Sequence, residues 1–294
     1  MEGVTVLIDG NNLVMRSLMA MRSKQTMLSS HGQNTGPLLV FARMLDRYIK
    51  YTKPDRVAIC WDSGDSWRKM VDDAYKANRH PAPDDEPDFE KFDTFTLVKE
   101  WLALNNVYTY GLHNYEADDL VAGFATSEKN ICSKVWIVSG DKDLLQMVED
   151  DHVVQIRPTS GMLPYEEVWN EARVLEVFGV SRSELTLMNA LTGDKSDNIP
   201  GLAGIGPVRA ATLVKASHGQ VAELVENERC REFQARIFMN LVLMDLRDPK
   251  LRPPLPRLPY FRPTSHEFIG WTALQGFLKE YQLASLLEMV IGGD

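Results

Sequence analysis

Apolar runs of strand length, each followed closely by a carboxylate, constrain the fold of this chain more than any other feature. The main runs are Val4–Asp9, Arg56–Trp61 and Lys134–Val138, and shorter strands are expected at residues 107–110 and 153–156. Helical patterns separate these runs along the chain. Continuous apolar strands that alternate with helices predict an α/β fold, with a mainly parallel central sheet flanked by helices.

Acidic side chains follow these strands at the points where the strands end. In an open parallel sheet, ligands bind at the carboxyl ends of the strands. We therefore expect the acids to meet at one edge of the sheet, although they are far apart in the sequence. The set is Asp9, Asp62, Glu116, Asp118, Asp119, Asp141 and Asp143.

A glycine-rich stretch at residues 193–206 adds two carboxylates, Asp194 and Asp197, and then leads into a helical pattern at 207–215. The glycines are expected to let backbone N–H groups approach a phosphate, and a helix N-terminus favours an anion. The glycines that form this predicted hairpin are Gly201, Gly204 and Gly206. A cation site beside a phosphate-binding hairpin indicates an enzyme that acts on a phosphodiester.

Nine carboxylates in one pocket would raise one another's pKa unless cations balanced them. Ligands that are all oxygen favour Mg²⁺, which Mn²⁺ can replace, over zinc. Two such ions would activate a water and stabilise the leaving oxygen of a displacement. A single Asp after a strand more often caps a helix, so the prediction depends on the set as a whole.

A second set of side chains follows the second strand and consists of Arg68, Tyr75, Lys76 and Arg79. Lys76 and Arg79 lie about one helical turn apart, and we expect them to hold the scissile phosphate. Tyr75 would stack on a terminal base. A solvated helix face explains the same pattern equally well. Duplex phosphates or ordinary surface charge would equally explain three further residues, Lys195, Arg209 and Lys215.

Composition and charge set broader limits. Taken alone, the net charge of −9 argues against nucleic-acid binding, because phosphate contacts need Lys and Arg. Binding depends on the local potential, however, and not on the charge of the whole chain. Three widely spaced cysteines indicate a reducing compartment. No apolar run is long enough to span a bilayer, and the N-terminus lacks a signal-peptide pattern. We therefore expect a cytoplasmic protein with no membrane partner.

The chain has room for one large or two moderate domains. We expect an α/β domain over residues 1–164 and a mostly helical region over 165–294. Helices of that region are predicted at 166–178, 182–191, 207–215, 220–225, 231–244, 271–281 and 284–291. The proline-rich segment 247–263 is expected to wrap the surface.

Several motifs occur in one order and together cover nearly the whole chain. They are residues 8–11, Asp62 and Arg68, residues 75–79, 116–119, 140–144, and 193–201 followed by 204–206. This set resembles the 5′–3′ exonuclease and flap endonuclease family. That family includes the N-terminal nuclease domain of bacterial DNA polymerase I and stand-alone phage enzymes. The resemblance implies a PIN-like fold, and the absence of a following polymerase domain favours the stand-alone type.

The resemblance implies Mg²⁺-dependent hydrolysis of DNA at or near 5′ ends, in primer or flap removal and in repair. It implies one metal group of Asp9, Asp62, Glu116 and Asp118, and a second of Asp119, Asp141, Asp143, Asp194 and Asp197. Lys76, Arg79, Asp141 and Asp143 would carry the catalysis. The expected substrates are 5′ flaps, nicked or gapped duplexes and RNA–DNA hybrids, the expected state is a monomer, and replication proteins are expected as partners.

The resemblance also implies two DNA-binding devices. A helical arch around residues 64–93 would admit a 5′ single strand, with Lys76 and Arg79 at its base. Its segment 84–90 is acidic, where positive charge would favour DNA. A helix–three-turn–helix around residues 186–216 would bind duplex phosphates and hold K⁺ at its backbone carbonyls.

Two other functions are compatible with parts of this pattern. One is a non-catalytic relative that binds branched DNA, which would not need the complete set of carboxylates and Lys76. The other is a PIN-type ribonuclease, which has an acidic pocket on an α/β sheet but lacks the glycine hairpin and the segment 75–79.

Overall fold

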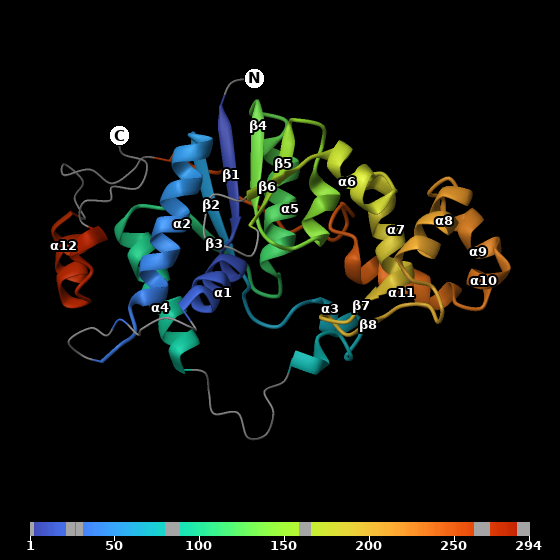
Figure 1. The fold of residues 1–294 in the computed structure, drawn as a ribbon, viewed down its shortest axis with the longest axis horizontal. Coiled ribbons are helices and arrows are strands. Elements are labelled where there is room, and N and C mark those ends of the chain that lie inside the picture. The colour runs from blue at the N-terminus through green and yellow to red at the C-terminus, as the bar shows by residue number, and fades with distance from the viewer. Residues whose placement is uncertain are drawn as a thin grey trace.

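A six-stranded sheet forms the centre of the computed structural model, which describes residues 3–21, 27, 32–79, 89–158, 166–261 and 271–286 (Figure 1). The strand order is β3-β2-β1-β4-β5-β6. The first five strands are parallel, and β6 is antiparallel to β5. This arrangement confirms the predicted α/β class. The strands are β1 Val4–Asp9, β2 Arg56–Trp61, β3 Thr109–Gly111, β4 Lys134–Val138, β5 Val153–Pro158 and β6 Glu166–Trp169.

The central strand β1 is buried on both faces, which explains its unbroken apolar sequence. Val6 and Ile8 point into one hydrophobic cluster, and Leu7 points into the cluster on the opposite face. Each of the three side chains is fully buried. Since successive side chains alternate across a sheet, a strand with helices on both faces needs apolar residues at every position.

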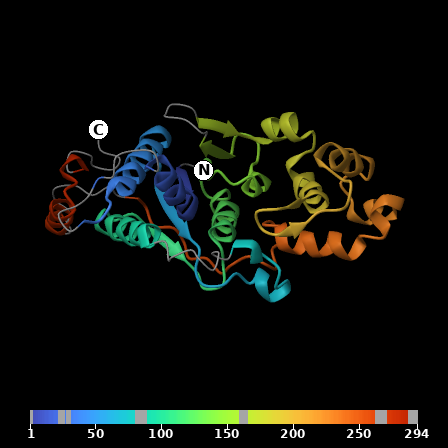
Figure 2. The ribbon, with the colours of Figure 1, turned by 60° about the horizontal axis from the view of Figure 1, so that its bottom comes forward.

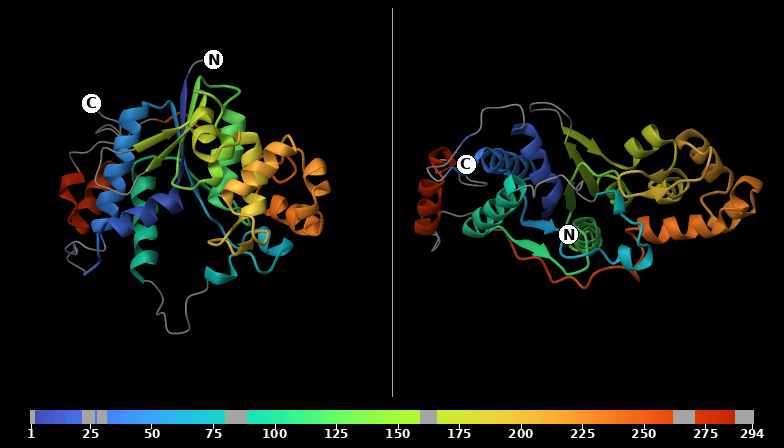
Figure 3. Two further views of the ribbon diagram at one scale, coloured as in Figure 1. Left: turned by 45° about the vertical axis from the view of Figure 1, so that its right-hand side comes forward. Right: turned by 90° about the horizontal axis from the view of Figure 1, so that it is seen from below.

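Helices cover both faces of the sheet, as Figures 1 and 3 show. One face is covered by α1 Gly10–Met21, α2 Gly36–Thr52 and α4 Phe89–Leu104, and α12 Trp271–Glu280 packs against α4 outside this layer. The other face is covered by α5 Ala117–Glu128 and the 3-10 helix η2 Asp143–Met147.

The segment after α11 crosses the α5 side of the sheet as an extended chain (Figure 3, right). Leu255 and Leu258 pack in the cluster of α5, and the Phe261 N–H donates to the Asp55 carbonyl at 2.7 Å. The described part of the predicted proline-rich wrap, residues 247–261, therefore does lie on the surface of the sheet unit.

A helical region lies beside the β5–β6 end of the sheet, and it shares a hydrophobic cluster with it. Leu145 and Trp169 from the sheet side pack with side chains of this region. Its elements are α6 Glu171–Phe178, α7 Arg182–Thr192, β7 Gly193–Asp194, β8 Ile199–Pro200, α8 Pro207–Ala216, α9 Val221–Glu226, α10 Glu228–Arg231 and α11 Gln234–Met244.

One predicted helix is wrong in its first part. Residues 166–178 were expected to form one helix, but Glu166–Trp169 forms the edge strand β6, and α6 begins only at Glu171. Trp169 is buried opposite Gln155 of β5, and the Asn170 side chain caps α6 by accepting the Arg173 N–H. The sheet therefore extends beyond residue 164, the predicted domain boundary.

Other predicted helices differ in their extent. The helix expected at 231–244 begins only at Gln234, as α11, because residue 231 ends the separate short helix α10. Of the predicted arch at 64–93, the described helical parts are α3 Arg68–Val71, η1 Ala77–Arg79 and the start of α4. Residues 80–88, which hold most of the acidic segment 84–90, lie outside the described residues. The helix expected at 284–291 is described only as η3 Ala284–Leu286.

Among the described residues, no helix has the length and apolar character needed to cross a membrane.

Two helical glycines are predicted to respond oppositely to substitution by alanine. A Cβ at Gly10, the first residue of α1, would lie 2.6 Å from the Trp61 ring, whereas a Cβ at Gly276 of α12 would meet nothing within 4 Å. Gly276→Ala should raise the free energy of unfolding by up to about 1 kcal/mol, because alanine favours a helix. Gly10→Ala should lower it by about 1–3 kcal/mol, because the packed Trp61 must move. Urea denaturation measures both, and a stabilising Gly10→Ala would contradict this packing.

Candidate active site

The carboxyl ends of adjacent strands bring the predicted acids to one edge of the sheet. Asp9 ends β1, Asp62 follows β2, and Asp141 and Asp143 follow β4. These strands are neighbours in the order β2-β1-β4. Asp118 joins them from the first turn of α5. We call these five carboxylates the acid edge.

Two asparagines at the start of α1 hold the strand ends on either side of β1. The Asn11 Oδ1 atom accepts the Asp62 N–H at 3.0 Å, and the Asn12 Oδ1 atom accepts the Gly140 N–H at 3.0 Å. Asp9 lies between them and accepts the Asn12 N–H at 2.9 Å. The start of α1 therefore fixes the spacing of the three strand ends.

The carboxylates of the acid edge repel one another. Burial raises the pKa of Asp9 to about 7, and the nearby Asp62 and Asp141 add to the effect. Burial, with Asp141 and Asp9 close by, holds the pKa of Asp118 well above its usual range. Burial and Asp141 raise the pKa of Asp143 to about 7. Each shift shows that the ionised form lacks sufficient positive charge from the protein itself.

A set of oxygen donors with this surplus of negative charge fits a hard divalent cation. Across the described residues, no three acidic, histidine or cysteine side chains are arranged to hold an ion as they stand. The donor chemistry therefore fits the predicted metal, whereas a closed ligand set is not formed.

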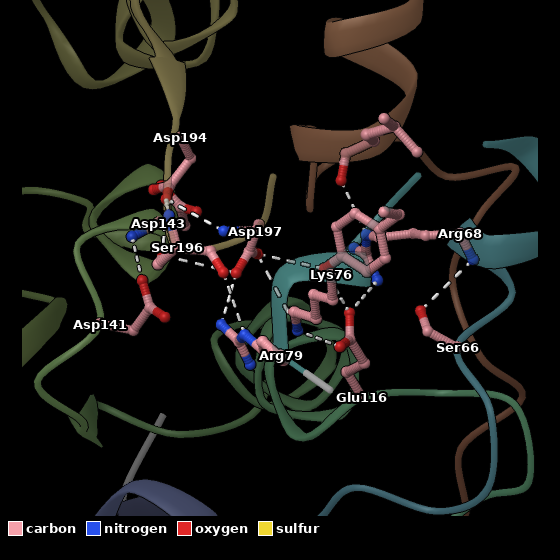
Figure 4. Close-up of polar contacts among 12 residues, drawn as sticks. Ser66, Arg68, Lys76, Arg79, Glu116, Asp141, Asp143, Asp194, Ser196 and Asp197 are labelled. Atoms are coloured by element: carbon pink, nitrogen blue, oxygen red, sulfur yellow. Dashed lines mark hydrogen bonds and ion pairs between the residues drawn. The ribbon is translucent and has the colours of Figure 1, made fainter. Parts of the chain in front are cut away.

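Glu116 lies at the N-terminus of α5 but is held by positive groups, unlike the acid edge. It accepts from Arg68 Nη1 at 3.0 Å and from the Tyr75 hydroxyl at 2.8 Å, and it forms an ion pair with Lys76. Although burial opposes ionisation, Lys76 and Arg68 hold the pKa of Glu116 below its usual value. Glu116 thus positions Lys76 in this structure, rather than facing the acid edge with a free carboxylate (Figure 4).

Arg68 and Asp119 form a buried ion pair. Arg68 Nη1 and Nη2 donate to the two Asp119 oxygens at 2.8 and 2.7 Å, and Arg68 Nε donates to the Leu243 carbonyl at 2.7 Å. Arg68 is only 3% exposed and Asp119 only 6%. Both side chains are therefore engaged within the protein in this structure, and metal binding by Asp119 and DNA contact by Arg68 stay predictions.

Stacking of Tyr75 on a base stays a prediction, and in this conformation the ring is buried. The Tyr75 side chain is 3% exposed and packs against Ile199, Leu243 and Met244. Its hydroxyl donates to Glu116 and, at 3.2 Å, to Asp197. Tyr75 therefore joins the two halves of the protein and offers no exposed ring face.

Lys76 and Arg79 are bound to the loop that carries Asp194 and Asp197 (Figure 4). The Lys76 N–H donates to the Asp197 carbonyl at 2.8 Å, and its Nζ atom lies 3.9 Å from the Asp197 carboxylate. Arg79 donates through Nη2 to the Asp197 carboxylate and through Nε to the Ser196 carbonyl. The predicted phosphate-binding pair therefore lies beside the second group of carboxylates.

Asp194 is held by Ser196 of its own loop and by Lys142, which directly precedes η2. Its Oδ1 atom accepts the Ser196 N–H at 2.7 Å, and its Oδ2 atom lies 2.9 Å from Lys142 Nζ. Burial acts to raise the pKa of Asp194, but Ser196 and Lys142 outweigh it and lower the pKa. Asp194 and Asp197 therefore face the acid edge with positive charge already beside them.

The glycines of the hairpin divide into two kinds. Gly193 and Gly201 face each other, and a Cβ on Gly201 would overlap the Thr192 carbonyl. These two glycines allow close backbone packing. Gly204 and Gly206 lie just before α8 and are exposed. Three basic residues of this region are exposed too, namely Lys195, Arg209 and Lys215. Arg209 donates to the Gly204 carbonyl. The exposed set remains a prediction for duplex binding.

Several site residues gave no signal in the sequence. Asn11, Asn12 and Gln155 are neutral amides that act on backbone groups, and amides occur at many sites without function. Lys142 lies inside a recognised motif, between Asp141 and Asp143. A run of asparagines directly after a strand was the one available signal.

Comparisons with known proteins agree with this architecture. The family model described as 5′-3′ exonuclease, N-terminal resolvase-like domain, matches residues 4–179. The 5′-3′ exonuclease of Aquifex aeolicus is 34% identical over 75% of this chain and 72% of its own length. The chain belongs to the 5′-3′ exonuclease family. This confirms the predicted family and enzyme class, a 5′ nuclease.

Two further relatives define how far the likeness extends. DNA polymerase I of Caldicellulosiruptor bescii is 32% identical over 76% of this chain, which spans about a quarter of the length of that relative (25%). The bacteriophage T5 D15 flap endonuclease, solved in a complex with DNA and metal ions, has a TM-score of 0.68. The match covers 83% of this chain and 89% of the phage chain at 21% identity, and it shows a shared fold.

The buried Arg68–Asp119 pair predicts a large loss of stability when one partner is removed. Arg68→Met should lower the free energy of unfolding by about 3–5 kcal/mol, because Asp119 would remain buried and unpaired. Lys69→Met is the matched control, since Lys69 pairs with Asp65, whose side chain is 83% exposed. It should change stability by less than about 0.5 kcal/mol. Equal effects in urea denaturation would contradict the structural role of Arg68.

Proposed function

We propose that the chain is a divalent-metal-dependent, structure-selective 5′ nuclease that hydrolyses DNA phosphodiesters at or near 5′ ends. The observation that carries the proposal is the meeting of the acid edge with Lys76 and Arg79. These cations come from a different segment and are fixed beside Asp197 by backbone and side-chain hydrogen bonds. Negative ligands and positive phosphate donors in one place suit phosphodiester hydrolysis better than binding alone.

The acid edge is the proposed metal site, with Asp194 and Asp197 as further ligands and Mg²⁺ as the preferred ion. Mn²⁺ would substitute, since it shares the preference for oxygen. When bound, these ions would supply an activated water and stabilise the leaving oxygen. The metal-binding T5 relative supports this assignment. The proposed ligands are Asp9, Asp62, Asp118, Asp141, Asp143, Asp194 and Asp197.

Lys76 and Arg79 are proposed to hold the scissile phosphate. An ionised donor forms a stronger hydrogen bond to a phosphate than a neutral donor does. Both side chains keep contact with solvent, since Lys76 is 17% and Arg79 is 52% exposed. A phosphate that approaches the acid edge can therefore compete with Glu116 and Asp197 for these donors.

The exposed hairpin is proposed to hold the duplex at a fixed distance from the acid edge. Gly204, Gly206, Lys195, Arg209 and Lys215 would contact phosphates, and K⁺ would bind backbone carbonyls of the hairpin. Gly206 precedes α8 as its N-cap, and Pro207 is the first helical residue, so the free backbone N–H groups of the first turn could bind an anion.

We propose separate roles for the two parts of the chain. The α/β unit, extended to include β6, would cut the DNA, and the helical region would hold it. Primer or flap removal in replication and repair is the proposed cellular role. RNA–DNA hybrids as further substrates, replication proteins as partners, a monomeric state and a cytoplasmic location belong to the proposal too.

Metal removal should abolish the activity. Each of three 5′-labelled substrates, a flap, a nicked duplex and an RNA–DNA hybrid, should be tested with EDTA, with Mg²⁺ and with K⁺ alone. Cleavage near the 5′ end is expected with Mg²⁺ only, and Asp141→Asn should remove it while flap binding persists. Binding without cleavage by the wild type would favour the non-catalytic alternative, and cleavage in EDTA would refute the metal mechanism.

Lys76→Ala should reduce the rate of the chemical step more than the affinity for DNA. The expected loss in single-turnover rate is about 10²–10³-fold, as for removal of one donor to a developing charge. Lys69→Ala is the matched control, because Lys69 lies on α3 and pairs with an exposed carboxylate. A large loss of flap affinity with an unchanged rate would contradict the proposed role of Lys76.

A further inference from the structure

The turn that follows β4, residues 139–141, has an unusual number of side-chain partners. It carries Asp141 and directs the chain to Asp143. Because the turn lies outside the strands, its backbone groups have few partners in the sheet ladder. The Ser139 N–H still donates to the Ile156 carbonyl at 3.3 Å. Side chains serve the remaining groups.

All three carbonyls of the turn accept from side chains of β5. Gln155 Nε2 donates to the Ser139 carbonyl at 2.9 Å and to the Asp141 carbonyl at 2.6 Å. Arg157 Nη2 donates to the Gly140 carbonyl at 3.0 Å. One amide nitrogen therefore spans the two ends of the turn, and a guanidinium holds its middle.

The N–H groups of the turn are held from the other side. The Gly140 N–H donates to Asn12 Oδ1 at 3.0 Å, and the Asp141 N–H donates to Ser139 Oγ at 3.0 Å. Ser139 Oγ itself donates to Asp9 at 3.0 Å. The Asp143 N–H then donates to Asp141 Oδ1 at 2.8 Å. The orientation of both carboxylates therefore depends on the geometry of this turn.

Gln155 is the informative member of the set. It is fully buried, and its neighbours Val153, Val154 and Ile156 on β5 are buried apolar residues. An apolar residue at 155 would continue the strand without the desolvation of an amide. The carboxamide instead directs both of its donors to the turn. Arg157 is similarly fixed, with its guanidinium over the Trp169 ring at 5.0 Å.

We propose that Gln155, with Arg157 and Asn12, is a positioning residue that sets the Asp141 and Asp143 carboxylates for a divalent cation through the turn at 139–141. The inference rests on the proposed function of the acid edge as a metal site. Groups that orient metal ligands commonly change metal affinity by about 10–100-fold when they are removed. Gln155 is neutral, so its replacement leaves the charge of the site unchanged.

The test is direct titration of the full chain with Mn²⁺, without DNA, monitored by the electron paramagnetic resonance signal of free Mn²⁺. Gln155→Met should raise the dissociation constant by about 10-fold or more. Asn12→Ala, which removes one partner of the turn, should raise it by a smaller factor. In nuclease assays, both variants should need more Mg²⁺ for half-maximal rate and should approach the wild-type rate when Mg²⁺ is saturating.

The matched control is Asn105→Leu, which also replaces a buried carboxamide by an apolar side chain of similar shape. Asn105 is 4% exposed and donates to the Trp101 carbonyl at 2.8 Å. It precedes β3, so it lies at the amino ends of the strands, whereas the acid edge lies at their carboxyl ends. Its Mn²⁺ affinity should stay within about twofold of wild type, and urea denaturation in EDTA should report its loss of stability.

Mn²⁺ affinity within twofold of wild type in folded Gln155→Met would overturn the inference, as would an equal loss in Asn105→Leu. If Gln155→Met does not fold, Asn12→Ala decides by the same criterion. A wild-type chain that binds Mn²⁺ but cuts no 5′ flap would overturn the proposed function and leave this inference standing. A wild-type chain that cuts flaps, with variants of unchanged Mn²⁺ affinity, would overturn this inference alone.

Discussion

Repulsion among crowded carboxylates determines how the charges of this structure are arranged. Five of them meet where β1, β2 and β4 end and α5 begins, and burial there raises the pKa of Asp9 and of Asp143 to about 7. The protein offsets part of this charge with cations placed on the surrounding acids: Arg68 on Asp119, Lys76 on Glu116, Arg79 on Asp197 and Lys142 on Asp194. The remaining negative charge is concentrated where the proposed metals would bind.

The same charge distribution joins the two parts of the protein. The segment with Lys76 and Arg79 is bonded to the loop with Asp197, and Arg68 connects α5 to the end of α11 through the Leu243 carbonyl. Figure 2 shows α3 beside α11 at this junction. These contacts join the hairpin side of the protein to the α5 side. They would give the proposed constant distance between duplex binding and the cut a physical basis.

The sequence allowed the acid edge to be predicted, because the rule for parallel sheets needs only strand ends. It did not allow the roles of individual acids to be assigned. Asp119 differs from the acid edge through its pairing with Arg68, which is 51 residues away in sequence. Gln155 gave no signal, since a buried amide in a strand has no characteristic pattern. The edge strand β6 was taken for helix because pairing with β5, a tertiary contact, decided the conformation of residues 166–169.

Thermal unfolding of wild type and Asp118→Asn, each in EDTA and in Mg²⁺, measures how far carboxylate repulsion destabilises the folded protein. Asp118 is half-buried among Asp141 and Asp9, so its neutralisation should relieve repulsion. The variant should therefore melt at a higher temperature than wild type in EDTA. Mg²⁺ should stabilise wild type more than the variant, because binding to the folded state raises stability. A variant that is less stable than wild type in EDTA, with an equal gain from Mg²⁺, would show that repulsion among these carboxylates does not govern the site.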